Sequence, residues 1–290
     1  MNACDQSREA LRLLKSLPAE ILSQIISKLH NIDIKNLRQT CIYFKDIARP
    51  RINRLFLSTN LKDIQVFRAV ADHEFYRYEV TEIIYDDVRF SHADDIASES
   101  DYDIADNIGD TTGTPLWFCD LYRKLSQQQQ ATIATNRDAD ALKYGLSRLT
   151  NLRRVTITPA AHGVPGRPLY YTPAIRSLAR GVLYPIERGW PATMLEVGND
   201  QLEEEGWNEE EKAQWRGYFL VSRTLAQHLR DNPRTKFAEL IIDTNQLRTG
   251  ISSRIFEEAE SSEKTDLITI LGQPGFTRLD LSLLWKPTRV

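Results

Sequence analysis

The amino-acid sequence predicts an α/β protein, in which a short helical unit at the N-terminus precedes a longer region of alternating strands and helices. Three observations predict this class. Apolar residues recur at three- and four-residue steps through the N-terminal segment as far as Pro50, which is typical of amphipathic helices. Beyond Pro50, apolar runs of strand length alternate with further helical patterns. Finally, 41% of the 290 residues are apolar, enough for a sizeable core, so disorder of the whole chain is excluded.

Charge and cysteine content narrow the class of partner and the compartment. The chain carries 37 basic and 40 acidic side chains, a net charge of -3, so we expect neither nucleic acid nor a membrane as partner. Three widely spaced cysteines, Cys4, Cys41 and Cys119, form no C-x-x-C pair, so neither a disulfide framework nor a zinc site is indicated. The charged N-terminus lacks the apolar core of a signal peptide, and no long apolar run follows it. We therefore expect a cytoplasmic or nuclear protein.

A first helix is predicted over residues 17–29. Pro18 suits its first turn, where an amide would have no intrahelical acceptor, and Glu20 faces the positive end of the helix dipole. At about 100° per residue, five apolar side chains share a stripe about 140° wide. They are Ile21, Leu22, Ile25, Ile26 and Leu29. A stripe of this width needs a surface to pack against.

Two further short helices are predicted between Asp33, a natural N-cap, and Pro50, with a bend near Cys41. Together with the first helix they make a three-helix unit. So few residues bury little surface on their own, so we expect another chain or the following domain to complete the unit.

The order of residues in this unit resembles the F-box. The matching positions are Leu17-Pro18, Glu20, Ile21-Leu22, Ile25-Ile26, Leu29, Ile32-Asp33-Ile34, Leu37-Arg38, Cys41, Phe44 and Ile47-Ala48. Proteins similar in this way are substrate-recognition subunits of SCF-type cullin-RING ubiquitin ligases, whose F-box binds the Skp adaptor. The resemblance implies that the adaptor contacts Leu17, Pro18, Ile21, Leu22, Ile25, Ile34 and Leu37. The alternative is that these helices form the N-terminal layer of one continuous core.

Five strands are predicted after Pro50, near residues 55–58, 81–85, 154–158, 238–242 and 278–282. Spacings such as Leu149, Leu152, Val155 and Ile157 resemble the leucine-rich repeat, in which each strand forms one rung of a solenoid. Taking residues 83, 155, 241 and 279 as strand centres gives intervals of 72, 86 and 38 residues. Regular repeats are roughly 20 to 29 residues long, so the array must be irregular.

An F-box followed by such a degenerate solenoid is common among fungal F-box proteins. The expected domains are an N-terminal extension at 1–12, the F-box at 13–50, and an irregular leucine-rich-repeat-like region at 51–290 that binds a protein target. The alternative for the last region is an ordinary α/β domain with a parallel sheet. Because the chain ends soon after the last rung without a visible polar cap, we also expect the C-terminal end of the array to be incomplete.

Two segments stand outside the strand and helix pattern. Residues 86–110 hold nine acidic side chains against one basic, Arg89, and are predicted to be a solvated loop. The aspartates of this loop lack the spacing of a calcium-binding loop. Residues 208–232 are predicted to form one long helix whose aromatic and aliphatic stripe is buried.

Motifs for catalysis are not found. The five histidines are isolated, and neither H-E-x-x-H nor G-x-S-x-G occurs. We therefore expect no enzymatic activity, no cofactor and no metal. The expected function is recognition of a protein target for an SCF-type ligase, and the alternative is a ligase-independent scaffold that holds the adaptor. A hydrolase whose catalytic residues are scattered along the sequence is a third interpretation.

Overall fold

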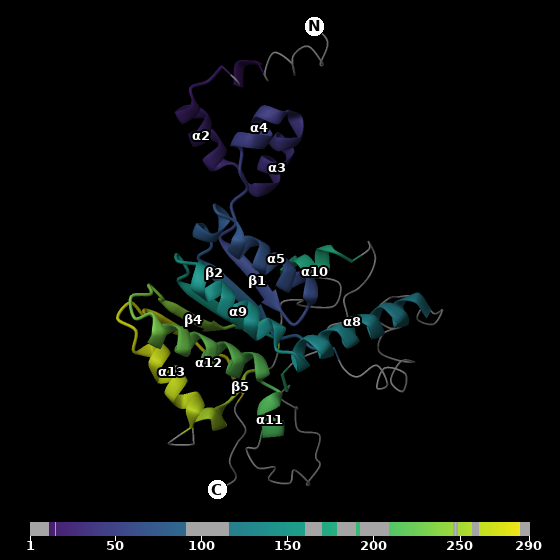
Figure 1. Ribbon diagram of the computed structural model, residues 1–290, viewed down its shortest axis with the longest axis vertical. Coiled ribbons are helices and arrows are strands. Elements are labelled where there is room, and N and C mark those ends of the chain that lie inside the picture. Colours follow the sequence, from purple (N-terminus) through teal and green to yellow (C-terminus); the bar gives the residue numbers. More distant parts are fainter. Residues whose placement is uncertain are drawn as a thin grey trace. The chain divides into compact units, whose positions relative to one another are not determined.

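The computed structural model shows a chain that divides into two compact units after Ile52. The first unit consists of helices, and the second is built on a parallel sheet (Figure 1). The structure describes residues 12–14, 16–90, 116–159, 170–178, 190–191, 209–245, 247, 249–256 and 261–284.

The first unit contains three described helices longer than one turn. Helix α2 (Ala19–Lys28) begins directly after Pro18, which itself has an extended backbone with φ −52° and ψ 145°. The next two helices, α3 (Asn31–Thr40) and α4 (Ile42–Ile47), are separated by Cys41. The extended backbone of Cys41, with φ −164° and ψ 163°, makes the bend that the sequence predicts there.

These three helices enclose a core of their own. Phe44 and Ile34 are completely buried, although both belong to short helices. This core is small, and completion of the unit by another chain or by the following domain stays a prediction. The core consists of Leu22, Ile26, Ile34, Phe44 and Ala48, with Leu14, Leu29, Leu37 and Cys41 packed against it.

The segment that follows α4 is tied back to the turn between α2 and α3. The side-chain amide of Asn31 donates to the carbonyl of Arg51 at 2.7 Å and accepts from the Arg51 amide at 2.8 Å. The guanidinium of Arg51 in turn donates to the carbonyls of Ser27, at 2.9 Å, and Leu29. A cation at these carbonyls stabilises the C-terminal end of α2.

The second unit is built on a five-stranded sheet in which every strand is parallel to its neighbours and the strands follow one another in chain order. All five strands lie in one sheet at the predicted positions, which confirms the predicted strands. Their bounds are β1 (Arg54–Ser58), β2 (Glu82–Asp86), β3 (Arg154–Thr158), β4 (Glu239–Ile242) and β6 (Arg278–Asp280).

Alternate residues of each strand face opposite sides of this sheet. One side is apolar and buried, as the row of Leu55, Ile83, Val155 and Leu240 shows. The residue of β4 in register with Val155 is therefore Leu240, and the predicted strand centre at Ile241 was one position off. Because a shift of one residue moves a side chain to the opposite face, Ile241 belongs to the other side of the sheet.

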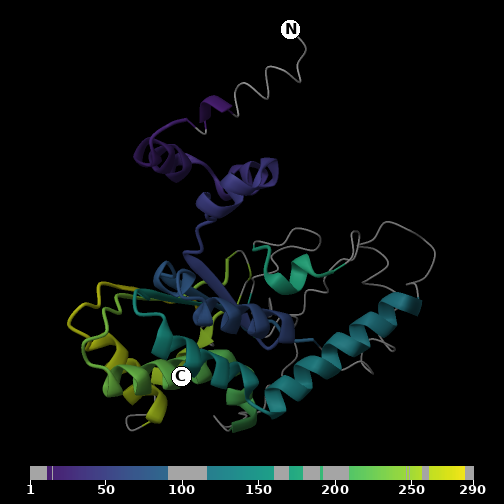
Figure 2. The ribbon, with the colours of Figure 1, turned by 45° about the horizontal axis from the view of Figure 1, so that its top comes forward.

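Four helices cover the buried side, and each contacts the next along the chain. Figures 1 and 2 show them side by side in one layer beside the sheet. The strands in the sheet and the helices in the layer are therefore both arranged in the order in which they occur along the chain. These helices are α5 (Leu61–Asp72), α9 (Arg137–Arg148), α12 (Arg216–Asp231) and α13 (Ser262–Leu271).

Shorter and flanking elements complete the second unit. A long helix, α8, reaches away from the layer in both views (Figure 2). Two short strands pair in parallel as a separate sheet. The bounds of these elements are η1 (Tyr76–Tyr78), α8 (Leu116–Ala134), α10 (Pro173–Arg176), α11 (Glu209–Ala213), β5 (Ile251–Ser252), η2 (Ser253–Phe256) and β7 (Leu283–Leu284).

The predicted acidic loop at 86–110 is wrong in its first residues. Asp86 ends strand β2, and Asp87 is buried. The Asp87 carboxylate accepts hydrogen bonds from the Trp190 indole at 2.8 Å and from the Gly217 amide at 2.9 Å. These donors compensate the cost of burying a charge, which sequence composition cannot reveal. Residues 91–110 lie outside the described part of the chain.

The predicted single helix at 208–232 is two helices, α11 and α12. The chain leaves the helical conformation at Trp215, with φ −108° and ψ 30°, and the indole donates to the carbonyl of Gly250 at 2.8 Å. Burial of the Trp215 side chain with its N–H hydrogen-bonded stabilises the fold more than continuing the helix through this residue would. The predicted burial of the stripe is confirmed for Trp215, Tyr218, Ser222, Leu225, Ala226 and Leu229, and Asn208 lies outside the described residues.

Candidate functional site

The apolar stripe of α2 changes from exposed to buried across its width. Taking about 100° per residue from Ile21, the order around the helix is Ile21, Ile25, Leu29, Leu22 and Ile26. Ile21 and Ile25 are 44% and 39% exposed, whereas Leu22 and Ile26 are 2% and 8% exposed. Leu29 lies between them in both angle and burial. The unit's own core therefore uses one edge of the stripe, and the other edge stays open.

This gradient separates the residues that the sequence assigned to an adaptor surface. The assignment of Leu22 and Ile34 to the adaptor surface is corrected, because both side chains lie in the unit's own core and leave no surface for a partner. Leu17 and Leu37 are partly buried, and Pro18 is exposed with Ile21 and Ile25. An adaptor contact by these five residues stays a prediction.

Further exposed apolar side chains of the same unit were not assigned from the sequence. Ile32, Ile42, Tyr43 and Ile47 are all exposed. The signal was present in the run Ile42-Tyr43-Phe44, because three adjacent residues of one helix cannot all face the core. The core takes Phe44 and leaves the other two in solvent.

The open side of the sheet carries a row of alternating charges. The register aligns Arg54, Glu82, Arg154, Glu239 and Arg278, one from the first residue of each strand. Glu82 pairs with Arg54 at 2.9 Å and with Arg154 at 3.9 Å. Glu239 pairs with Arg154 at 2.7 Å and with Arg278 at 3.7 Å. Each glutamate of this row therefore lies between two arginines, which favours the observed order of strands.

A pocket of about 380 Å³ opens on this side of the sheet. Thr156 and Ile241, which lie next to each other in register, both line it. Tyr170 contributes a ring that packs on Phe56 with the ring centroids 5.6 Å apart. Burial raises the pKa of Tyr170, the negative charge of Asp243 raises it further, and Arg54 opposes both. The lining residues are Arg54, Glu82, Arg154, Thr156, Tyr170, Ile241, Ile242, Asp243, Arg278, Asp280, Leu281 and Ser282.

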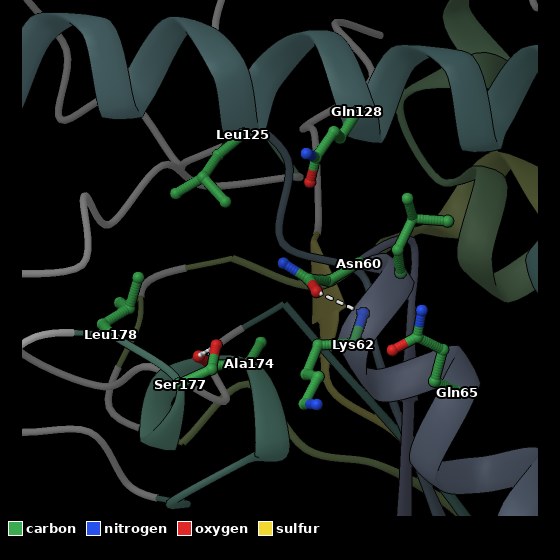
Figure 3. Close-up of a pocket in the computed structure, with 9 residues that line it drawn as sticks. Asn60, Lys62, Gln65, Leu125, Gln128, Ala174, Ser177 and Leu178 are labelled. Atoms are coloured by element: carbon green, nitrogen blue, oxygen red, sulfur yellow. Dashed lines mark hydrogen bonds between the residues drawn. The ribbon is translucent and has the colours of Figure 1, made fainter.

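A second pocket, of about 260 Å³, lies at the N-terminal end of α5 (Figure 3). The Asn60 side chain in this pocket caps the helix, because its oxygen accepts the Lys62 amide at 2.8 Å. The Ser177 hydroxyl donates to the carbonyl of Ala174 at 2.6 Å. The remaining polar groups of the lining are the Lys62 ammonium and two side-chain amides, those of Gln65 and Gln128. This set contains no pairing of a nucleophile with a base.

Neither a metal centre nor a membrane span is found in the part of the chain that the structure describes. No group of three or more His, Cys, Asp or Glu side chains within the described ranges is arranged to hold a metal ion. Among the described helices, none combines the length and the apolar character that crossing a membrane requires.

Comparison with known proteins identifies the first unit. Residues 14–55 match the F-box-like family model, a range that holds all three helices and the first residues of β1. The chain therefore carries an F-box-like domain. Such domains typically bind the Skp adaptor in SCF complexes, and proteins that carry them are generally adaptors rather than enzymes. No curated protein and no solved structure matches the chain.

Proposed function

We propose that this protein is the substrate-recognition subunit of an SCF-type cullin-RING ubiquitin ligase. In this proposal the F-box-like domain binds the Skp adaptor, and the second unit binds a protein target. One observation carries the adaptor half of the proposal: Ile21 and Ile25 stay exposed on α2 although the adjoining Leu22 and Ile26 are buried. Exposed apolar side chains on one face of a helix favour contact with another protein.

The second unit is proposed to be an irregular leucine-rich-repeat-like solenoid. Parallel strands in chain order, covered by α5, α9, α12 and α13 on one side, support this reading, because each strand pairs with the next and each of these helices contacts the next, as in a repeat array. Successive strands begin 28, 72, 85 and 39 residues apart, so the repeats are unequal in length. The side of the sheet away from the helices is then the surface that meets the target.

Such a subunit needs no catalytic residue. A target held on the second unit lies close to the ubiquitin carrier that the adaptor and cullin bring, which raises its effective concentration there. The proposal therefore includes no enzymatic activity and no cofactor. Since the ligase acts on intracellular targets, we also propose a cytoplasmic or nuclear location.

A ligase-independent scaffold is the second candidate. In that case the F-box-like domain would hold the adaptor, and no cullin would join the complex. Copurification of the full chain with the adaptor, followed by addition of a cullin-RING core, separates the two candidates. Assembly of the cullin with the chain and ubiquitination of a bound protein support the ligase, and exclusion of the cullin supports the scaffold.

The adaptor contact is tested by the variant Ile21→Ser with Ile25→Ser. Both side chains are exposed, so the fold should survive while adaptor affinity falls by roughly thirtyfold or more, as expected for apolar anchors worth about 2 kcal/mol. The sequence-based variant Leu17→Ala with Pro18→Ala should act in the same direction. Isothermal titration calorimetry with purified adaptor measures the affinity, and circular dichroism checks the helices.

The matched control is Ile268→Ser on α13, because Ile268 is also an exposed isoleucine of a helix but belongs to the second unit. It should leave adaptor affinity unchanged. If the folded Ile21→Ser, Ile25→Ser variant binds the adaptor as tightly as the unchanged chain, the proposed adaptor surface is wrong.

A further inference from the structure

One arginine that lines the pocket on the open side of the sheet uses only part of its hydrogen-bond donors for neighbouring residues. Arg54 donates from Nε to Glu82 at 2.9 Å, and its side chain is 52% exposed. Its two terminal nitrogens make no hydrogen bond with the residues that the structure describes. Arg154, in the middle of the same row, pairs with glutamates on both sides. Arg54 therefore has free donors in a planar fork, the geometry that suits a carboxylate.

A free acceptor lies elsewhere on the rim of the same pocket. One oxygen of Asp243 accepts the Asn245 amide at 2.8 Å, where Asn245 has a positive φ of 52°. The other oxygen has no hydrogen-bond partner within the described ranges. Asp243 directly follows strand β4, whereas Arg54 begins β1, so the two charges come from opposite ends of the parallel strands.

Tyr170 lines the same pocket as both charges. Its ring is held against Phe56 on β1. The hydroxyl forms no hydrogen bond within the described part of the chain, so it can serve an incoming polar group.

The charges that line this pocket are balanced. Three arginines, at 54, 154 and 278, face three carboxylates, those of Glu82, Asp243 and Asp280. A polyanion would meet the carboxylates, and a polycation would meet the arginines. Charge complementarity therefore favours an occupant that carries one charge of each sign and no net charge.

We propose that the pocket binds an extended segment of the target protein in which an acidic side chain pairs with Arg54 and a basic side chain a few residues away pairs with Asp243. This inference rests on the proposed function, because it gives the target of the second unit a chemical identity. The segment lies over Thr156 and Ile241, and the Tyr170 hydroxyl bonds to its backbone or to the acidic side chain.

The test is a selection from a displayed library of random twelve-residue peptides on the full-length chain. Enriched peptides should contain an acidic and a basic residue at a constant spacing. Replacing the acidic residue of a selected peptide with its amide should lower affinity about tenfold, as loss of a charge-assisted hydrogen bond does. The variant Arg54→Gln should lower affinity by the same factor but should not weaken the amide form any further.

Asp243→Asn provides the second half of the test. Asparagine keeps the oxygen that accepts the Asn245 amide, so the turn is preserved while the charge is removed. This variant should abolish the preference for the basic residue and leave the preference for the acidic one. Arg223→Gln is the matched control, because Arg223 is an exposed arginine on α12, in the helix layer on the other side of the sheet.

Several results would overturn the inference. They are a library without enrichment, peptides enriched in one sign of charge alone, equal effects of Arg54→Gln and Arg223→Gln, and tighter binding when phosphoserine replaces the acidic residue. Adaptor affinity is measured on the same preparations. Adaptor binding without peptide selectivity rejects this inference alone, whereas peptide selectivity without adaptor binding rejects the proposed ligase function.

Discussion

Arg216 and Asp138 join helices α12 and α9 through two parallel hydrogen bonds. The guanidinium of Arg216 donates to the two oxygens of Asp138 at 2.6 and 3.0 Å. The Asp138 side chain is completely buried, and it also accepts the Tyr85 hydroxyl at 2.6 Å. Burial lowers the pKa of Arg216, but the hydrogen bonds and charge of Asp138 outweigh it and raise the pKa. Arg216 therefore stays charged, and the pair, together with Tyr85, links the helix layer to strand β2.

Arg216→Met should destabilise the second unit by about 3–5 kcal/mol, because it leaves the buried Asp138 carboxylate without its cation. Urea unfolding followed by tryptophan fluorescence measures the loss. All five tryptophans follow residue 53, so this signal reports only on the second unit. Arg223→Met on the same helix is the control and should change stability by less than about 0.5 kcal/mol. A loss below about 1 kcal/mol for Arg216→Met would show that the pair is dispensable.

Gly217→Ala should destabilise the second unit by about 1–3 kcal/mol, because a side chain cannot fit beside Asp87. A Cβ at Gly217 would lie 2.4 Å from the Asp87 carboxyl carbon, which is held in place by Trp190. The matched variant is Gly275→Ala, whose Cβ would lie 3.5 Å from its nearest neighbour, the Phe237 carbonyl oxygen. Urea midpoints of the two variants should differ clearly, and equal midpoints would contradict the close approach at Gly217.

The stability of the second unit should fall between pH 10 and pH 12. Burial raises the pKa of Tyr218 from 10.0 to about 12 in the folded chain. Above pH 10 the unfolded phenol loses its proton while the folded one keeps it, so rising pH favours unfolding. Below pH 10 the contribution of Tyr218 to the free energy of unfolding is fully present. About 2–3 kcal/mol of it is lost by pH 12.

Tyr218→Phe isolates this contribution, because it keeps the ring and removes the group that titrates. The free energy of unfolding of the variant should fall less steeply above pH 10 than that of the unchanged chain. Tyr85, whose pKa burial also raises, titrates in both proteins and cancels in the comparison. Parallel pH profiles for the two proteins would refute the assignment to Tyr218.

Arg38→Met should loosen helix α4 of the F-box-like domain. Arg38 donates to the carbonyls of Lys45 at 2.5 Å and Ala48 at 2.7 Å, and so caps the C-terminal end of that helix. Loss of these charge-assisted bonds should cost about 1–2 kcal/mol and speed hydrogen exchange at the Ala48 amide. Lys35→Met on α3 is the control, because Lys35 is exposed on the same helix as Arg38. Unchanged exchange in Arg38→Met would disprove the capping role.

The sequence by itself determined the positions of the five strands and of the N-terminal helices, because local periodicity records which residues share a face. The strands at 54–58 and 154–158 lie where their patterns predicted them. The F-box pattern was also readable, since it spans few residues in unbroken order. The family match at residues 14–55 rests on the same local signal.

Only the tertiary structure decided which residues of those patterns are buried and which groups meet. The stripe on α2 was visible in the sequence, but only packing against Phe44 and Ile34 assigned Leu22 to the core and left Ile21 exposed. Asp138 and Arg216, or Arg154 and Glu239, are 78 and 85 residues apart in the chain. The pairing of Asp138 with Arg216 depends on the order of the helices. The pairing of Arg154 with Glu239 depends on strand register, because a shift of one residue would place either side chain on the opposite face of the sheet.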